Sequence, residues 1–462
     1  MLLSTDDTIC AVATPLGTSG IGVIRLSGPD ALDIASKIFS INIKQSPSHT
    51  LHHGNVLDPL NGSIIDDAVV AIFKNPKSYT GEDVVEFSCH GSLPVLKDIL
   101  NVLLNSGARL AESGEFTKRA FFNGKLDLSQ AEAVNDLIRA GSDKAREIAV
   151  RQLKGALSKT INAASNQILG VIAAVEAAVD FPDDVDEPNS AWLKSEISKV
   201  LEDLDGLISS AQKGRIYREG LRIVIAGHVN VGKSSLLNAL LRHSRAIVTP
   251  IPGTTRDIIE ENLEICGIPV IAIDTAGIRD TIDPVEIIGV ERSWESVESA
   301  DIILLVLDIN EGLTKSDLQV FDAVSNNKPV IVVLNKTDKL SIHEQENAKQ
   351  QIIKDIKHPI TSVLTSAFIG EGIEYLENTI AAVSGDVGEL ESVTVSNVRH
   401  MQALAEASKS LKQALFTLEL NQPIDLLNVD LTSARYNLGL ITGESAAEDL
   451  LERIFSEFCI GK

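Results

Sequence analysis

The sequence predicts a parallel α/β domain inserted into a helical domain and preceded by an α+β N-terminal domain. Three changes of hydrophobic pattern predict this fold class. Short β-branched runs broken by Gly and Pro fill the first part of the chain, as in "IGVIRLSG". Helical spacing takes over from Ala131 to Ala178. A strand-helix alternation then opens at "LRIVIAG" and lasts to about Val383, after which helical spacing returns.

These changes of pattern also set the expected domain boundaries. Because two helical stretches flank an α/β unit whose own signals are complete, that unit is best interpreted as an insertion. We expect four segments: an N-terminal domain at residues 1–120, the first part of the helical domain at 121–218, the α/β domain at 219–384, and the second part of the helical domain at 385–462.

The last helix is predicted to begin at Ser445, because Ser445 and Glu448 match a capping box. It runs into Phe455 and Phe458 and carries Cys459 to whatever surface its apolar face packs against.

Composition places the protein among globular chains of about three domains, with 462 residues and 44% hydrophobic content. No segment has the roughly 20 unbroken apolar residues of a membrane span, and the N-terminus lacks a signal peptide's pattern, so we expect a cytoplasmic protein. The four cysteines form no CxxC pair, which predicts free thiols. We expect Cys10, Cys89 and Cys266 to lie in cores; Cys89 is interpreted as structural, although His90 follows it.

Charge limits the partners that this chain can hold by itself. Lys and Arg total 41 against 64 Asp and Glu, a net charge of -23. Nucleic-acid binding usually needs a basic face, so any RNA would be held at one local patch or by a more basic partner. Aromatic content of 4% also argues against a base-stacking platform.

A phosphate-binding loop is the strongest local signal. "GHVNVGKSS" has Gly227, Gly232, Lys233 and Ser234 in register between a predicted strand and a predicted helix. Glycines let backbone N–H groups curl around phosphate, Lys233 supplies a charge to the β and γ phosphates, and the Ser234 hydroxyl can ligate magnesium.

Three further motifs follow in order on alternating strands and predict a GTPase. "DTAG" suits a magnesium-linked aspartate, Asp274, and an amide at Gly277 for the γ phosphate. "NKTD" places Asp338 to accept both N–H groups of the guanine edge, and "TSAF" offers the Ala367 amide to the guanine carbonyl. The expected nucleotide-binding residues are Asn230, Val231, Gly232, Lys233, Ser234, Ser235, Thr249, Pro250, Ile251, Pro252, Gly253, Thr254, Thr255, Asp274, Thr275, Ala276, Gly277, Asn335, Lys336, Asp338, Ser366 and Ala367.

Two departures from a Ras-like site bear on the mechanism. Ile278 stands where such enzymes carry the glutamine that positions water, so another group must do this work. In "TPIPGTTRD", Thr255 can reach magnesium, and the carbonyls of Thr249, Ile251 and Thr254 with Asn230 form a ring that suits a monovalent cation such as potassium. Arg256 is the competing source of that positive charge, although a solvated switch-loop residue is the preferred interpretation of Arg256.

These residues, together with "SYTGEDVVEFSCHG", "GEFTKRAFFNGKLDLSQAEAV" and the terminal "FCIGK", closely resemble the MnmE (TrmE) family of tRNA-modification GTPases over essentially the whole chain. The resemblance implies a homodimer with a folate-binding and dimerising N-terminal domain, a helical domain and a potassium-activated GTPase domain. It also implies work with the FAD- and NADH-using flavoprotein MnmG on the wobble uridine of certain tRNAs. The one-carbon unit would come from 5-formyltetrahydrofolate or another tetrahydrofolate derivative.

The resemblance further assigns roles to single residues. Asn230, Thr249, Ile251 and Thr254 become the potassium ligands, and Ser234 and Thr255 the magnesium ligands. Glu286 becomes the residue that positions water, where a solvated helix-face carboxylate is the alternative. The matching folate positions are Arg25, Glu86 and Lys125, with Lys462 reaching across; without the resemblance, Arg25 and Lys125 are ordinary surface cations and Glu86 a strand residue.

Cys459 is then a candidate catalytic thiol for one-carbon chemistry, with Lys462 favouring the thiolate. The alternative is a C-terminal segment that only closes the helical domain. For the whole protein, the rival hypothesis is a GTP-switched ribosome-assembly or regulatory factor without one-carbon chemistry. A filament-forming GTPase lacks the long heptad run that it would need.

Overall fold

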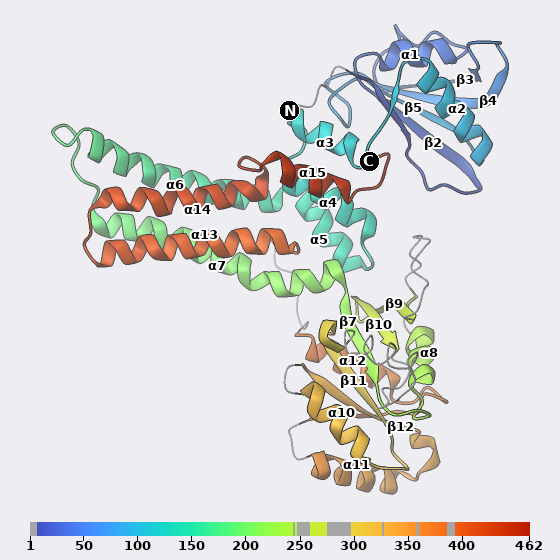
Figure 1. The fold of residues 1–462 in the computed structure, drawn as a ribbon, viewed down its shortest axis with the longest axis vertical. Coiled ribbons are helices and arrows are strands. Elements are labelled where there is room, and N and C mark those ends of the chain that lie inside the picture. The colour runs from blue at the N-terminus through green and yellow to red at the C-terminus, as the bar shows by residue number, and fades with distance from the viewer. Residues whose placement is uncertain are drawn as a thin grey trace, which may run out of the picture. The chain divides into compact units, whose positions relative to one another are not determined.

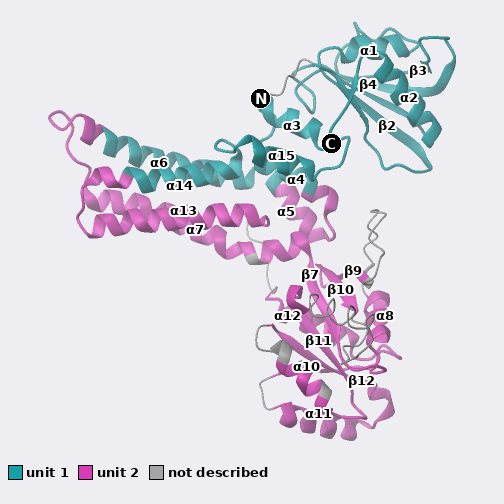
Figure 2. Ribbon diagram, viewed as in Figure 1, with its two compact units in different colours: residues 1–135, 152–176, 428–462 teal, residues 136–151, 177–427 magenta. Residues whose placement is uncertain are grey.

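The computed structural model describes residues 7–243, 245–246, 259–274, 297–325, 328–356, 360–385 and 393–462 (Figure 1). Its contacts divide the chain into two compact units (Figure 2). Unit 1 comprises residues 1–135, 152–176 and 428–462, and unit 2 comprises residues 136–151 and 177–427. Both ends of the chain therefore belong to unit 1, and the α/β domain belongs to unit 2.

The described part of unit 1 contains a six-stranded sheet of order β3-β4-β5-β2-β1-β6. Neighbouring strands are antiparallel except for the parallel pair β1 and β6. Helices α1 and α2 pack against each other and share one apolar core with the sheet. This is the predicted α+β domain. Its elements are β1 (Ile9–Val12), β2 (Ser19–Ser27), α1 (Ala31–Ile38), β3 (Thr50–Leu57), β4 (Ile64–Phe73), β5 (Val84–Gly91), α2 (Leu93–Asn105) and β6 (Arg109–Leu110).

Helices follow the sheet and return at the end of the chain. Phe455 and Phe458, near the C-terminus, pack in one apolar cluster with Leu128 and Ala131, so segments far apart in sequence share a core. Besides α1 and α2, the described helices that lie wholly or mainly in unit 1 are α3 (Glu115–Phe122), α4 (Leu128–Arg139), α6 (Ala156–Asp180), α14 (Leu427–Thr442) and α15 (Glu448–Ser456).

The predicted start of the last helix was wrong. Helix α15 begins at Glu448, and its N-cap residue, Ala447, makes no side-chain capping bond. Ser445 instead completes the turn after α14. Its N–H donates to the Gly439 carbonyl at 3.2 Å, and a Cβ at Gly439 would lie 2.4 Å from Ser445 Oγ. Close packing against Gly439 therefore keeps Ser445 out of the capping position.

Unit 2 contains a seven-stranded sheet in its described residues, of order β13-β12-β11-β7-β10-β9-β8. The strands β13, β12, β11, β7 and β10 are parallel, as predicted. Strands β9 and β8 are antiparallel additions at one edge, which the sequence did not predict. The strands are β7 (Leu221–Ala226), β8 (Arg245–Ala246), β9 (Ile259–Ile265), β10 (Ile268–Asp274), β11 (Ile302–Asp308), β12 (Val330–Asn335) and β13 (Thr361–Leu364).

Helices cover both faces of this sheet, which explains why β11 reads as one unbroken apolar run. Leu304 and Val306 of β11 point to the side of α8 and α12, while Leu305 and Leu307 point to the side of α10 and α11. The helices and short 3-10 turns of unit 2 are α5 (Asp143–Leu153), α7 (Ser190–Glu219), α8 (Lys233–His243), α10 (Lys315–Ser325), η1 (Thr337–Lys339), α11 (Ile342–Ile356), α12 (Ile373–Val383), α13 (Val398–Glu419) and η2 (Ile424–Leu426).

The α/β domain is joined to helical segments through its core. Ala145 and Ile148 of α5 and Tyr217 of α7 belong to the same buried cluster as strands β7 and β10. Lys144 fixes this joint, since its Nζ donates to the Tyr217 hydroxyl at 2.8 Å. Within the described ranges, every helix is too short or too polar to cross a bilayer.

Candidate functional site

The loop between β7 and α8 has the geometry that a phosphate cradle requires. Gly227 and Gly232 adopt φ values of +142° and +101°. A Cβ at Gly227 would lie 2.3 Å from the Val306 carbonyl oxygen, and one at Gly232 would lie 2.4 Å from Asn335 Nδ2. No side chain fits at either position, so glycine lets the loop backbone approach a ligand closely at the N-terminus of α8, where anions bind favourably.

The side chain of Lys233 lies against this loop. Its ammonium donates to the carbonyls of Gly227 at 2.9 Å and His228 at 3.0 Å. The residue is only 8% exposed. These contacts place the Lys233 Nζ inside the loop, where an ammonium attracts phosphate oxygens.

A hydroxyl and a carboxylate lie together beside the loop. The Ser234 hydroxyl donates to Asp274 Oδ2 at 2.8 Å. Asp274 lies at the end of β10, and its Oδ1 is buried without a hydrogen-bond partner among the described residues. A hydroxyl beside a carboxylate with a spare buried oxygen is the donor set that magnesium prefers, so these residues fit the ion.

The base side of the site is built around Asn335, the last residue of β12. Its Nδ2 donates to the Val231 carbonyl at 2.9 Å, and its Oδ1 accepts from the Ala367 N–H at 3.0 Å. Asp338 is exposed, and its Oδ1 accepts from the Ser366 hydroxyl at 2.5 Å. Asn335 thus ties the phosphate loop to the loop after β13, and Asp338 presents its carboxylate beside them. Whether the Ala367 amide serves a guanine carbonyl stays a prediction.

Several predicted site residues lie outside the described residues. They are Thr249, Pro250, Ile251, Pro252, Gly253, Thr254, Thr255, Arg256, Thr275, Ala276, Gly277, Ile278 and Glu286.

A second site forms in unit 1, where the C-terminal segment (residues 459–462) joins the N-terminal sheet. Ile460 pairs with Ser113 in a β-bridge. The Gly114 N–H donates to the Cys459 carbonyl at 3.4 Å, and the Phe116 N–H donates to the Lys462 main-chain oxygen at 3.2 Å. These two bonds occupy amide groups at the start of α3 that the helix itself leaves unpaired.

Arg25, Glu86 and Lys462 meet at this junction. Arg25 Nε and Glu86 Oε1 lie 2.8 Å apart, and Arg25 Nη1 donates to the Gly461 carbonyl at 3.4 Å. Burial, reinforced by the positive charge of Arg25, lowers the pKa of Lys462, although Glu86 and Cys459 act in the opposite direction. The predicted grouping of these three residues is therefore present in the structure.

Aromatic rings, which sequence reasoning missed, form one wall of this junction. The Arg25 guanidinium lies 5.3 Å from the ring centre of Tyr79 and 5.6 Å from that of Phe116. The one sequence feature that could have indicated Tyr79 is the scarcity of tyrosine, since the chain contains four. The Lys125 Nζ donates to the Pro76 carbonyl at 2.9 Å, on the loop that also carries Tyr79.

The thiols differ in their surroundings. Cys10 and Cys89 are buried, and burial raises the pKa of Cys10 to about 12 and that of Cys89 to about 11. Cys459 is exposed. Cys266 is also exposed, so its predicted core position was wrong; it adopts φ +51° in the turn between β9 and β10, where a side chain faces outward.

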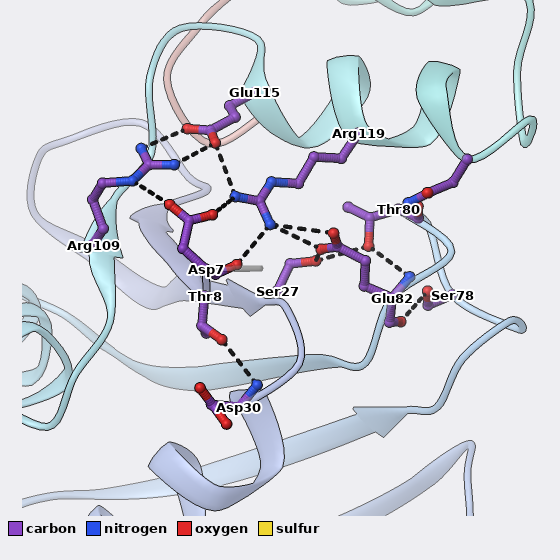
Figure 3. A network of polar contacts seen from close by, with 11 residues as sticks. Asp7, Thr8, Ser27, Asp30, Ser78, Thr80, Glu82, Arg109, Glu115 and Arg119 are labelled. Carbon is purple, nitrogen blue, oxygen red and sulfur yellow. Dashed lines mark hydrogen bonds and ion pairs between the residues drawn. The ribbon is translucent and has the colours of Figure 1, made fainter. Parts of the chain in front are cut away.

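An ion-pair network centred on the buried Arg119 connects α3 to the neighbouring segments (Figure 3). Arg119 of α3 is 1% exposed and bonds to Asp7, Glu82 and Glu115. Glu82 in turn accepts from the Ser27 hydroxyl of β2 at 2.7 Å. One guanidinium therefore ties the start of the described chain, β2 and the loop of Tyr79 to α3, the helix whose first amides hold the C-terminal segment.

Comparison with known proteins gives the family. A profile described as "MnmE helical domain" matches residues 128–459, and one described as "GTP-binding protein TrmE N-terminus" matches residues 8–125. The tRNA modification GTPase MnmE of Desulforamulus reducens is 46% identical over 99% of this chain and 100% of its own length. That of Thermoanaerobacter pseudethanolicus is 48% identical over 99% of both chains. The chain belongs to the MnmE family.

Membership in the MnmE family confirms the resemblance, the three-part fold class and the GTPase class of enzyme. Among solved structures, Era from Aquifex aeolicus, bound to GDP and AlF4-, is 31% identical, with a TM-score of 0.31 over 41% of this chain and 66% of that one.

The Arg119 network should make the N-terminal unit of this MnmE-family protein sensitive to acid. Burial alone would raise the pKa of Glu115, but hydrogen bonds from Arg109, the Glu112 N–H and Arg119 outweigh it and lower the pKa. The pKa of Asp7 is lowered in the same way. A carboxylate whose folded pKa is depressed stabilises the fold above its unfolded pKa, near 4, and loses that contribution as pH falls through the folded pKa.

We therefore expect Arg119→Met to destabilise this unit by about 3 kcal/mol or more at pH 7, because Glu82 loses its ion pair and Glu115 and Asp7 keep only Arg109. The loss should shrink as pH falls below about 4, where the carboxylates become protonated. Amide hydrogen exchange of α3 and β2 peptides, corrected for intrinsic rates, measures both effects. Arg151→Met, which removes an exposed pair with Glu147, is the control. An equal loss at both pH values would contradict this interpretation.

Proposed function

We propose that this chain hydrolyses GTP in the service of tRNA modification, adding a carboxymethylaminomethyl or aminomethyl group at C5 of the wobble uridine with the flavoprotein MnmG. The observation that carries the proposal is the placement of an exposed thiol, Cys459, on a segment bonded to the N-terminal sheet beside Arg25 and Glu86. A GTP-switched assembly factor without one-carbon chemistry has no need of this junction. The names of the curated relatives support the same function.

In the GTPase site, the backbone of the phosphate loop and Lys233 bind the phosphates, and Asp338 selects guanine. Ser234, Thr255 and Asp274 would hold magnesium, which neutralises charge on the transferred phosphoryl group. Asn230 with the carbonyls of Thr249, Ile251 and Thr254 would hold potassium, which supplies the positive charge that other GTPases take from an arginine finger. Glu286 positions the attacking water, because Ile278 cannot. Arg256 remains the alternative source of charge.

In the second site, Arg25, Glu86, Lys125 and Lys462 bind a tetrahydrofolate derivative such as 5-formyltetrahydrofolate. The cations Arg25 and Lys462 suit the carboxylates of such a ligand, and Glu86 suits the N–H donors of a pterin ring. Tyr79 and Phe116 add apolar walls. Cys459, exposed beside Lys462, then acts as a nucleophile in one-carbon transfer.

The remaining parts of the proposal concern assembly. The N-terminal domain, residues 1–120, dimerises the protein, and the G domain at 219–384 is inserted between the two helical parts at 121–218 and 385–462. With a net charge of -23, the chain needs its flavoprotein partner to hold most of the tRNA. The complex works in the cytoplasm.

The function is tested by mass spectrometry of wobble-uridine nucleosides in tRNA from a host that lacks its own copy of the gene. The intact gene should restore the modified nucleoside, and its Cys459→Ser form should not, because the serine hydroxyl is a far weaker nucleophile at neutral pH. Cys266→Ser, also an exposed thiol, is the matched control and should restore it. If Cys459→Ser restores the nucleoside fully, the thiol is structural. If no form restores it while all forms hydrolyse GTP, the protein is better explained as a GTP-switched assembly or regulatory factor without one-carbon chemistry.

Potassium should activate the GTPase. Replacing sodium by potassium at constant ionic strength is expected to raise the rate of GTP hydrolysis by about tenfold or more, since one transition-state charge contact is gained. Asn230→Ala should abolish the difference between the two salts, and Asn347→Ala, on the exposed side of α11, should retain it. Equal wild-type rates in both salts would rule out the cation site.

A further inference from the structure

Asp308 is a buried acidic residue of the G domain to which neither motif nor resemblance assigns a role. It is the last residue of β11, the strand between β7, which leads into the phosphate loop, and β12, which leads into "NKTD". It stands in register with Asn335 on β12. Asp308 is 5% exposed, so its charge needs compensation from the protein.

Both oxygens of this carboxylate are occupied. Oδ2 lies 2.8 Å from the Lys336 ammonium. Oδ1 accepts from the backbone N–H of Asn310 at 3.0 Å and from its Nδ2 at 2.8 Å. Burial alone would raise the pKa of Asp308, but these bonds outweigh it and lower the pKa, so the group is ionised at neutral pH. An ionised, three-fold bonded carboxylate is a rigid anchor for a cation.

Lys336 connects Asp308 to the phosphate loop. Its Nζ also donates to the main-chain carbonyl of Asn230 at 2.6 Å. Asn230 and Lys336 both adopt left-handed backbone conformations, with φ of +64° and +66°. Such conformations are costly for residues other than glycine and persist only where their surroundings hold them. A positive charge fixed on the Asn230 carbonyl is one such restraint.

We propose that Asp308 is a positioning residue of the GTPase site: it holds Lys336 so that the ammonium fixes the Asn230 turn of the phosphate loop. The Lys336 ammonium therefore positions both the residues that select the base and the residues that bind the phosphates. The consequence for potassium rests on the function proposed above, since Asn230 is the cation ligand there. Loss of Asp308 frees the lysine, relaxes the Asn230 turn and weakens both nucleotide and potassium binding.

The test is the affinity for GDP of Asp308→Asn, which keeps the shape and removes the charge. Measured in potassium-free buffer with a fluorescent GDP, the affinity of Asp308→Asn should be roughly tenfold below that of wild type, which corresponds to about 1.4 kcal/mol of binding free energy. Asp301→Asn is a matched control, because Asp301 directly precedes β11 at its other end and pairs with Arg215 at 2.7 Å. Its effect on GDP affinity should stay below about twofold. Equal effects of the two substitutions would overturn the proposal.

A double-mutant cycle with Lys336→Met shows whether Asp308 acts through the lysine. If it does, adding Asp308→Asn to Lys336→Met should weaken GDP binding by no more than about twofold beyond Lys336→Met alone. Multiplying effects would overturn the proposal. Should Asp308→Asn not fold, Asn310→Ala removes the Nδ2 bond at an exposed residue and should weaken GDP binding by about threefold; no change would count against the proposal.

Potassium separates this inference from the proposed function. In Asp308→Asn, the potassium concentration for half-maximal GTP hydrolysis should rise several-fold, and in Asp301→Asn it should not. If wild-type protein shows no response to potassium, the cation site is wrong, while the GDP affinities still decide the role of Asp308.

Discussion

The fold of unit 1 depends on the return of the C-terminal segment to the N-terminal sheet. The Ile460 bridge to Ser113 and the two bonds from the start of α3 join residues that lie more than 340 positions apart in the chain. Gly461 makes this approach possible, because at φ +93° a Cβ there would lie 2.4 Å from the Val12 carbonyl oxygen. Arg25 then reaches the Gly461 carbonyl, so the same contact that closes the unit also assembles the junction of Arg25, Glu86 and Lys462. With the described start of the chain and its C-terminal segment held in one unit, the α/β domain is accommodated as an insertion.

The G domain uses a different principle, the meeting of strand ends at one edge of a parallel sheet. Strands β7, β10, β11 and β12 end at Ala226, Asp274, Asp308 and Asn335, and each leads into or carries a polar group of the nucleotide site. Two of these carboxylates bond to neighbouring side chains: Asp274 accepts from the Ser234 hydroxyl, and Asp308 pairs with the Lys336 ammonium.

The sequence predicted the parts of the fold that local patterns determine. The phosphate loop, the parallel sheet of the α/β domain and the helical stretches around it follow from glycine spacing and apolar periodicity. What it missed depends on contacts between distant residues. Packing against Gly439 keeps Ser445 out of the N-cap position, and the turn between β9 and β10 exposes Cys266. Tyr79, Phe116, Arg119 and Asp308 carried no local signal, because a buried ion pair or a ring beside a guanidinium looks in sequence like any polar or apolar residue. Arg25, Glu86 and Lys462 were grouped through family resemblance alone.

The most direct test is equilibrium binding of 5-formyltetrahydrofolate to the wild-type protein and to Gly461→Ala. Gly170→Ala is the control, because a Cβ at Gly170 on α6 meets no atom within 4 Å. The added methyl group at Gly461 collides with the Val12 carbonyl and should displace the C-terminal segment. We expect wild type and Gly170→Ala to bind the folate equally and Gly461→Ala to bind it at least about tenfold more weakly, with GTP hydrolysis unchanged. Equal binding by all three proteins, or none by wild type, would contradict it.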